Sequence, residues 1–168
     1  GINIGVVSDQ LGIGASPALA EDSLVARYGM LALHTGAAVN IQHISSRNSV
    51  KMVALAKQLG ADVWAEVTPH HFTLDETAVL KHGTLAKMNP PLRGREDREA
   101  LRQAVADGTI EVIATDHAPH TAEQKSRGLA GSATGIVGLE CAFPLLYTYL
   151  VKPGLLTTEQ PIERVVLA

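Results

Sequence analysis

The sequence has 168 residues, of which 46% are hydrophobic and 18% are charged, and its formal net charge is −3. This is the composition of an ordinary globular chain that can bury one core. A negative net charge without a basic block argues against a nucleic-acid partner. The apolar runs are shorter than the roughly 18 residues that a membrane span needs, so we expect a cytoplasmic protein with no membrane partner. The single cysteine, Cys141, agrees with a reducing compartment.

The first half of the chain shows two strand signals, each followed by a different kind of connection. Residues 39–44 form a short β-prone run, and residues 47–59 follow with helical spacing until Gly60 stops the pattern. Residues 63–68 repeat the strand signal. A longer polar connection comes next, in which residues 74–80 are expected to form one or two helical turns.

The second half repeats this alternation more loosely. Residues 95–107 have a helical pattern with acidic residues in the first turn, and the apolar strand 110–113 follows. Residues 121–134 are rich in glycine, serine, alanine and charge and are expected to form a mobile loop, before residues 139–150 return to a helical pattern. Strands alternating with helices predict the α/β class, with either an open doubly wound parallel sheet or a (β/α)8 barrel.

Polar side chains follow the ends of all three predicted strands. His43 follows the first strand, His70 and His71 follow the second, and the run ATDHAPH at residues 114–120 follows the third. The carboxyl ends of parallel strands meet at one edge of a sheet, which is where such folds place their sites. Five of the seven histidines are therefore expected at one face. Because buried Asp and His are costly unless paired or metal-bound, this clustering favours a site.

The residue types suggest the chemistry of this site. Imidazoles from separate strands, together with a carboxylate, suit a divalent transition metal such as zinc, which can activate a water molecule. A carboxylate beside that water can pass its proton to a leaving group, the role that we assign to Asp116. A plainer interpretation also stands, in which each histidine is merely hydrogen-bonded and Asp116 caps a turn. Phosphate-loop and GxSxG motifs are absent from the sequence.

Five ordered segments resemble the motifs of a known enzyme family. They are QHISS (42–46), AEVTPHHF (65–72), KMNPPLRGREDREAL (87–101), GTIEVIATDHAPH (108–120) and GIVGLECAFPLLYTYL (135–150). With this order and spacing the chain resembles the bacterial class I dihydroorotases of the amidohydrolase superfamily. The resemblance implies a partial (β/α)8 TIM barrel of the metal-dependent hydrolase type. It also implies reversible hydrolysis of dihydroorotate to N-carbamoyl-aspartate in pyrimidine biosynthesis.

The resemblance also assigns roles around the metal. His43 and Asp116 would be metal ligands, and Asp116 would in addition carry the proton during catalysis. The cofactor would be zinc, as one or two ions. His70 and His71 match the family's TPHH motif but are expected to support the site from behind the ligands or to be structural.

Further residues would contact the small-molecule substrate. Asn89 and His120 would hold the ring and the carboxylate of dihydroorotate. The backbone of Ile136, Val137 and Gly138 would lie against the pyrimidine ring. For Asn89 there is an alternative, because Asn before Pro favours turns.

The chain departs from the family in its length. A complete barrel takes about 250 residues, and the family's HxH pair, the arginine that follows it and two further metal ligands are not found in these 168 residues. We therefore expect residues 1–168 to be the carboxyl-half segment of a single amidohydrolase barrel domain, with the amino-terminal half and the end of the chain missing. Such a segment is expected to be inactive alone, and its open sheet edges favour pairing with the missing half or a homo-oligomer.

Three other functions remain open. The first is a related cyclic amidohydrolase, such as a dihydropyrimidinase or an allantoinase, although Asn89 and the DHAPH run favour dihydroorotase. The second is a non-catalytic dihydroorotase-like subunit that scaffolds aspartate transcarbamoylase. Such subunits lose metal ligands, whereas both ligands expected in this segment are kept. The third is a parallel α/β binding domain whose His and Asp residues only satisfy local hydrogen bonds.

Overall fold

The computed structural model describes residues 1–161 and 164. Within these residues, three strands form a parallel sheet in the order β1-β2-β3. The strands are β1 (Val39–Ile41), β2 (Val63–Val67) and β3 (Val112–Ile113). The helices are α1 (Val6–Leu11), α2 (Ala18–Thr35), α3 (Arg47–Gln58), α4 (Pro69–Thr73), α5 (Ala78–His82), the 3-10 helix η1 (Gly83–Ala86), α6 (Arg95–Asp107), α7 (Ala122–Lys125), α8 (Gly128–Gly131), α9 (Ala142–Leu146) and the π-helix η2 (Tyr147–Val151).

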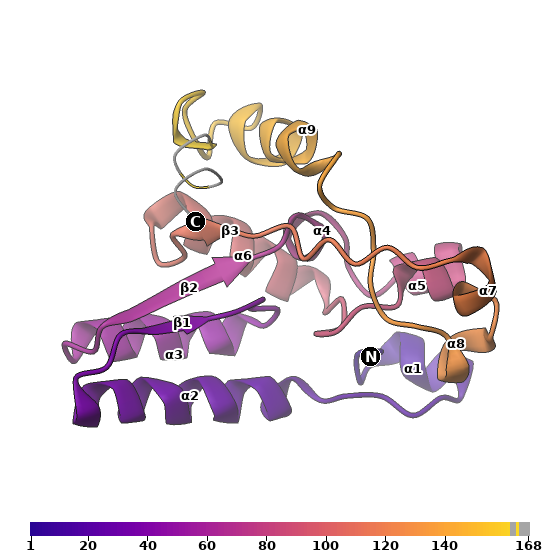
Figure 1. Ribbon diagram of the computed structural model, residues 1–168, viewed down its shortest axis with the longest axis horizontal. Helices are drawn as coiled ribbons and strands as arrows, with labels where there is room; N and C mark the ends of the chain where they lie inside the picture. The colour runs from indigo at the N-terminus through magenta and orange to yellow at the C-terminus, as the bar shows by residue number, and fades with distance from the viewer. Residues whose placement is uncertain (162–163, 165–168) are drawn as a thin grey trace.

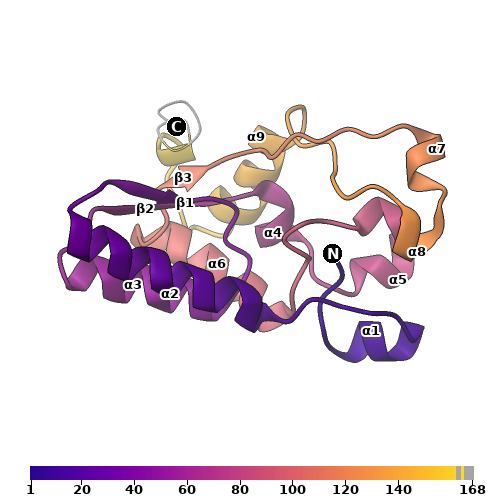
Figure 2. The same ribbon diagram turned by 60° about the horizontal axis from the view of Figure 1, so that its bottom comes forward.

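Helices connect the parallel strands, as the sequence predicts. The chain passes from β1 through α3 to β2, and from β2 through α4, α5, η1 and α6 to β3. Figures 1 and 2 show α2, α3 and α6 lying along one face of the sheet. The expectation of an α/β chain with a parallel sheet is therefore confirmed. No helix in the described part of the chain is long and apolar enough to cross a membrane.

Helix α6 is an element whose bounds could be predicted from the local sequence. It occupies residues 95–107, the range that the sequence predicts. Its buried side chains, Leu101, Ala104 and Val105, form one apolar face against the sheet core. Gly108 ends the helix in the left-handed conformation, with φ of 83°, which glycine adopts without a steric penalty.

The connection after β2 differs from the prediction of one or two turns at residues 74–80. Helix α4 begins directly after the strand, because Pro69 is at its first position and the Thr68 side chain accepts a hydrogen bond from the His71 backbone N–H at 3.3 Å. Residues 74–77 are not helical, and α5 begins only at Ala78. The helical turns expected at residues 74–80 are thus present only from Ala78 onward, and helix α4 was not expected.

Three other expectations need correction. The strand expected at residues 110–113 pairs with β2 only through Val112–Ile113. The helix expected at residues 139–150 begins at Ala142 and continues as a π-helix from Tyr147. The segment 121–134, expected to be a mobile loop, contains the short helices α7 and α8.

A buried arginine connects the sheet layer to the amino-terminal segment. The Arg93 side chain is 4% exposed, and its Nη1 donates to Asn3 Oδ1 at 3.0 Å and to the Ser16 carbonyl at 2.8 Å. Its Nε donates to Ser45 Oγ at 3.1 Å, and its Nη2 lies 3.6 Å from Glu21 Oε2. Arg93 therefore holds together segments that are far apart in the sequence.

Candidate active site

His43 and Asp116 meet at the carboxyl ends of β1 and β3. The His43 Nε2 atom lies 3.3 Å from Asp116 Oδ1, and about a quarter of each side chain is exposed, 24% and 28%. Both residues have positive φ, 53° for His43 and 45° for Asp116. Such a conformation is uncommon for residues other than glycine and tends to cluster at functional sites. The structure thus brings together the two residues expected to be metal ligands.

Glu66, at the end of β2, holds His43 from the other side. Glu66 Oε1 lies 2.6 Å from His43 Nδ1, and Glu66 Oε2 accepts a hydrogen bond from Asn40 Nδ2 at 3.2 Å. Because a carboxylate only accepts, Nδ1 carries a proton, and Nε2 faces Asp116, donating to it when the ring is protonated and offering its lone pair to a metal ion when the ring is neutral. A carboxylate behind a histidine in this way orients the ring and raises its basicity as a metal ligand.

The charges of these three residues affect one another. The hydrogen bond to Glu66 raises the pKa of His43, burial opposes this shift, and the charge of Asp116 adds to it. For Glu66, burial would raise the pKa, but the hydrogen bonds from His43 and Asn40 outweigh burial and lower it. A carboxylate on both sides of His43 therefore favours binding of positive charge at this position, as a proton or a metal ion.

The two histidines of the TPHH segment have different environments. His71 Nε2 donates to the Pro90 carbonyl at 2.9 Å, so its Nδ1 accepts from the Thr68 hydroxyl at 2.7 Å. Burial lowers the pKa of His71 to about 4. These contacts make His71 a neutral structural residue, as one of the two expectations had it. His70 is also buried, but its Nε2 has no hydrogen-bond partner among the described residues, and burial lowers its pKa to about 2.

The segment after β3 pairs with the glycine-containing segment expected to contact the substrate. His117 forms a parallel β-bridge with Ile136, and its Nδ1 accepts from the Gly138 N–H at 3.1 Å. A Cβ at Gly138 would lie 2.6 Å from the Thr115 carbonyl oxygen, so only glycine allows this approach. Ile136, Val137 and Gly138 line a cavity of about 270 Å³ that also borders His70.

The expected substrate residue His120 lies in the same pair of segments. Its Nε2 donates to the Thr134 carbonyl at 2.8 Å, two residues before Ile136. Four of the expected substrate contacts therefore come from two adjoining segments. They are His120, Ile136, Val137 and Gly138.

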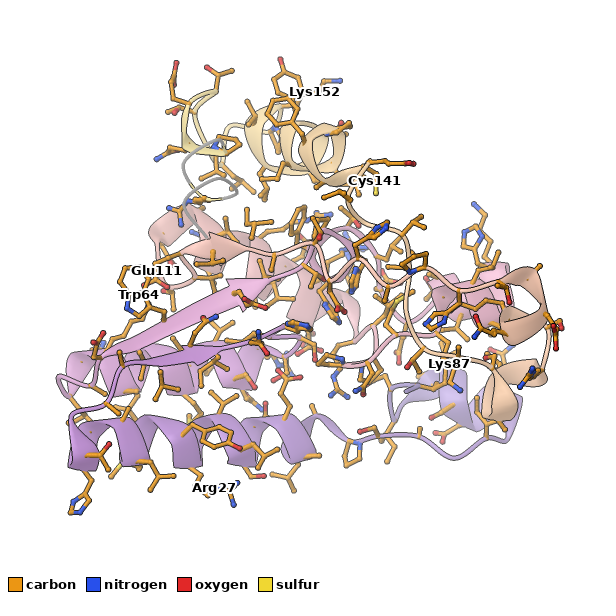
Figure 3. The ribbon with its side chains drawn as sticks, in the orientation of Figure 1. Arg27, Trp64, Lys87, Glu111, Cys141 and Lys152 are labelled. Carbon is orange, nitrogen blue, oxygen red and sulfur yellow. The ribbon has the colours of Figure 1, made fainter. Side chains whose placement is uncertain are left out.

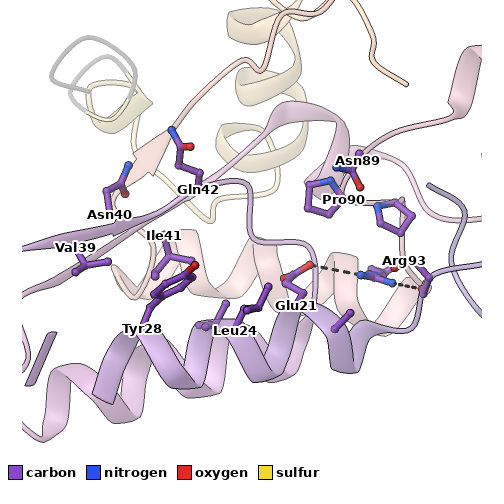
Figure 4. A pocket seen from close by; sticks show the side chains of 14 residues that line it. Glu21, Leu24, Tyr28, Val39, Asn40, Ile41, Gln42, Asn89, Pro90 and Arg93 are labelled. Atoms are coloured by element: carbon purple, nitrogen blue, oxygen red, sulfur yellow. Dashed lines mark hydrogen bonds and ion pairs between the residues drawn. The ribbon is translucent and has the colours of Figure 1, made fainter. Parts of the chain in front are cut away.

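Asn89 borders a different cavity from the one lined by Ile136, Val137 and Gly138. It borders a cavity of about 550 Å³ that runs along the outer edge of β1, between α2 and the segment 89–93 (Figure 4). His43 and Asp116 do not line this cavity, and within the described chain no hydrogen bond joins Asn89 to either of them. The lining is mostly apolar, with Leu24 and Tyr28 from α2.

His43 and Asp116 are of the residue types that bind zinc, but two ligands are fewer than a catalytic zinc site needs. An imidazole nitrogen and a carboxylate oxygen are zinc ligands, and a catalytic zinc site takes three protein ligands and a water molecule. Among residues 1–161 and 164, no group of three or more His, Cys, Asp or Glu side chains could hold a metal ion. His43 and Asp116 thus offer part of a metal site.

Comparisons with known proteins give the relationship of the chain. It is 54% identical over 164 residues to a dihydroorotase of Clostridioides difficile. The aligned residues make up 98% of this chain and 39% of the relative. The chain is 50% identical over 155 residues to a dihydroorotase of Streptomyces coelicolor. The aligned residues make up 92% of this chain and 36% of the relative. The chain is homologous to a part of each of these dihydroorotases. It spans well under half the length of these relatives, and no family model matches it.

Solved structures support the fold of this dihydroorotase homologue. It matches a D-hydantoinase (dihydropyrimidinase) from Thermus sp. with a TM-score of 0.79 and 30% identity, over 85% of this chain and 32% of the other. It matches a dihydropyrimidinase from Brevibacillus agri with a TM-score of 0.82 and 25% identity, over 88% and 33%. The expectation of a partial barrel of the amidohydrolase type is therefore confirmed.

Sequence reasoning missed Glu66, although the structure places it against His43. A signal was present in the sequence, because Glu66 is the one charged residue in the strand Val63–Val67, and the structure shows it to be 5% exposed. A buried carboxylate needs a partner, which here is His43. The three side chains Glu66, His43 and Asp116 thus form one series of contacts at the strand ends.

Proposed function

We propose that this chain is part of a metal-dependent dihydroorotase of the cytoplasm. The reaction is the reversible hydrolysis of the cyclic amide of dihydroorotate to N-carbamoyl-aspartate. The observation behind the proposal is the Glu66–His43–Asp116 arrangement at the strand ends, in a chain about half identical to dihydroorotases. Zinc is the proposed metal, as one or two ions.

The side chains have distinct tasks in this proposal. A bound metal ion supplies Lewis acidity that activates water and stabilises negative charge on the substrate oxygen. Asp116 takes the proton from the attacking water and gives it to the ring nitrogen that leaves. His43 and Asp116 would hold the ion, and Glu66, which accepts the proton on His43 Nδ1, would leave Nε2 free to act as a ligand.

The substrate is held by the residues around this pair. The backbone of Ile136, Val137 and Gly138 lies against the ring, and His120 binds the carboxylate. His120 Nε2 donates to the Thr134 carbonyl, so Nδ1 is the atom left for the substrate, and it can donate to the carboxylate only when the ring carries both protons. Asn89 is the remaining proposed substrate contact.

The remainder of the barrel is proposed to lie outside this chain. The outer edges of β1 and β3 have no neighbouring strand among the described residues. The cavity along β1 is the place where a preceding strand would pair. Residues 1–168 are thus the carboxyl-half segment of one barrel domain, and the complete protein forms a homo-oligomer, with aspartate transcarbamoylase as a further proposed partner. The segment produced alone is expected to show no turnover, and turnover would contradict this division.

The central test compares two aspartate variants of the protein that carries this sequence. Asp116→Asn is expected to lower kcat for dihydroorotate by about 10²- to 10⁴-fold, because it removes a general acid–base group. The matched control, Asp62→Asn, changes an exposed residue and should leave kcat unchanged. Equal activity of the Asp116 variant and the wild type would contradict the proposed role.

A second cyclic amidohydrolase activity is tested in parallel, since solved hydantoinases and dihydropyrimidinases share the fold. Dihydrouracil, hydantoin and allantoin are assayed beside dihydroorotate, and the highest kcat/KM identifies the substrate class. No turnover of any of them, with no bound metal, would instead favour a non-catalytic subunit.

A further inference from the structure

Two lysines are buried beside the proposed substrate segments without a carboxylate partner. Lys87 follows η1 and is 9% exposed, and Lys125 is at the end of α7 and is 7% exposed. In the described part of the chain, neither ammonium lies within 4.0 Å of a carboxylate. Lysine is almost never fully buried unless its charge is paired. The proposed mechanism does not yet use these two residues.

Lys87 holds the end of α8 and the residue that follows it. Its Nζ donates to the Ser132 carbonyl at 2.7 Å and to the Ala130 carbonyl at 3.3 Å. Its own carbonyl accepts a hydrogen bond from the Gly135 N–H at 3.0 Å. Figure 3 shows Lys87 beside α8, which packs against η1.

Lys125 makes the reciprocal connection. Its Nζ donates to the Gly135 carbonyl at 2.6 Å and to the Thr84 carbonyl in η1 at 3.1 Å. Lys87 thus reaches from the end of η1 to carbonyls of residues 130 and 132, and Lys125 reaches from α7 to one carbonyl of η1 and one of residue 135. Burial lowers the pKa of Lys125, and the nearby charge of Lys87 lowers it further, as expected where two cations share a site without a counter-charge.

The clamped segment leads directly into the substrate contacts. The Thr134 carbonyl accepts from His120 Nε2 at 2.8 Å, and the Ile136 carbonyl accepts from the Ala118 N–H at 2.9 Å. Between them, Gly135 approaches Ala118 so closely that a Cβ there would lie 2.7 Å from the Ala118 Cβ. The position of residues 134–136 therefore fixes both His120 and the start of the 136–138 backbone.

We propose that Lys87 and Lys125 are positioning residues that clamp residues 130–135 and so hold His120 and the 136–138 backbone ready for an anionic substrate. This inference rests on the proposed dihydroorotase function.

The test uses Lys87→Met and Lys125→Met in the protein that carries this sequence. Methionine keeps an unbranched apolar side chain but cannot donate to the carbonyls. We expect KM for dihydroorotate to rise at least about tenfold and kcat to change less than about threefold, because groups that bind substrate and transition state equally affect KM. Lys81→Met, at an exposed position of α5, is the control and should change neither constant.

Other outcomes separate this inference from the proposed function. A lowered melting temperature with KM within twofold of wild type in both variants would mean a purely structural role and would overturn the inference. If the methionine variants do not fold, Lys87→Gln and Lys125→Gln, which keep one donor group, should give an intermediate rise in KM, and an unchanged KM would overturn it. If the wild type does not turn over dihydroorotate, the proposed function fails.

The clamp is then tested by proteinase K cleavage within residues 121–134. The inference requires that both methionine variants are cleaved faster than the wild type in this segment.

Discussion

Replacing His71 by glutamine should change how the stability of this protein depends on pH. His71 is fully enclosed between Thr68 and Pro90 and is neutral in the folded state. Glutamine can still donate to the Pro90 carbonyl, but it does not titrate. The His71→Gln variant therefore removes a single buried titratable group and leaves most of its surroundings in place.

The size and sign of the effect follow from the pKa. Burial lowers the pKa of His71 from 6.5 to about 4. Below pH 6.5 the unfolded chain binds a proton at this histidine and the folded chain does not, so the free energy of unfolding falls as the pH falls. At 1.36 kcal/mol per pKa unit, the loss amounts to about 3 kcal/mol when the pH has reached about 4. The stability contributed by neutral His71 is fully present above pH 6.5.

The measurement is urea unfolding of wild type and His71→Gln at pH 7.5 and pH 4.5, with a chelator present so that metal binding does not contribute. The difference in unfolding free energy between the two proteins should shift by more than about 2 kcal/mol between these pH values, in favour of the variant at low pH. His34→Gln, an exposed change at the end of α2, is the control and should show no such shift. A shift below about 0.5 kcal/mol would refute the assignment of His71 as a buried neutral group.

Two further substitutions test the site and the packing. Glu66→Gln removes the negative charge behind His43 and should lower metal content or kcat/KM by about 10- to 100-fold. Glu99→Gln, at an exposed position, should lower neither, and unchanged values in both variants would contradict a role for Glu66. Arg93→Met leaves Glu21 without its buried partner and should lower the free energy of unfolding by about 3–5 kcal/mol, measured by urea denaturation. A loss under 1 kcal/mol would contradict this account of Arg93.

Local signals were enough for elements that end at strong stops or have a clear apolar face. Helix α6 was predicted within its observed bounds because acidic residues begin it and Gly108 ends it. The segment 121–134 was predicted less well, because its polar composition suggested a loop. Its short helices are held by Lys87 and Lys125, whose contacts cannot be read from composition.

The sequence by itself determined the alternation of strands and helices and the expectation that His43 and Asp116 meet, because parallel strands bring their carboxyl ends to one edge. Only the tertiary structure decided which side chains support that pair. Glu66 reaches His43 from 23 residues away, and Lys87 reaches Ser132 across 45 residues. Such contacts depend on how the elements pack. Local sequence patterns therefore do not predict which distant backbone carbonyl or imidazole a buried charged group will contact.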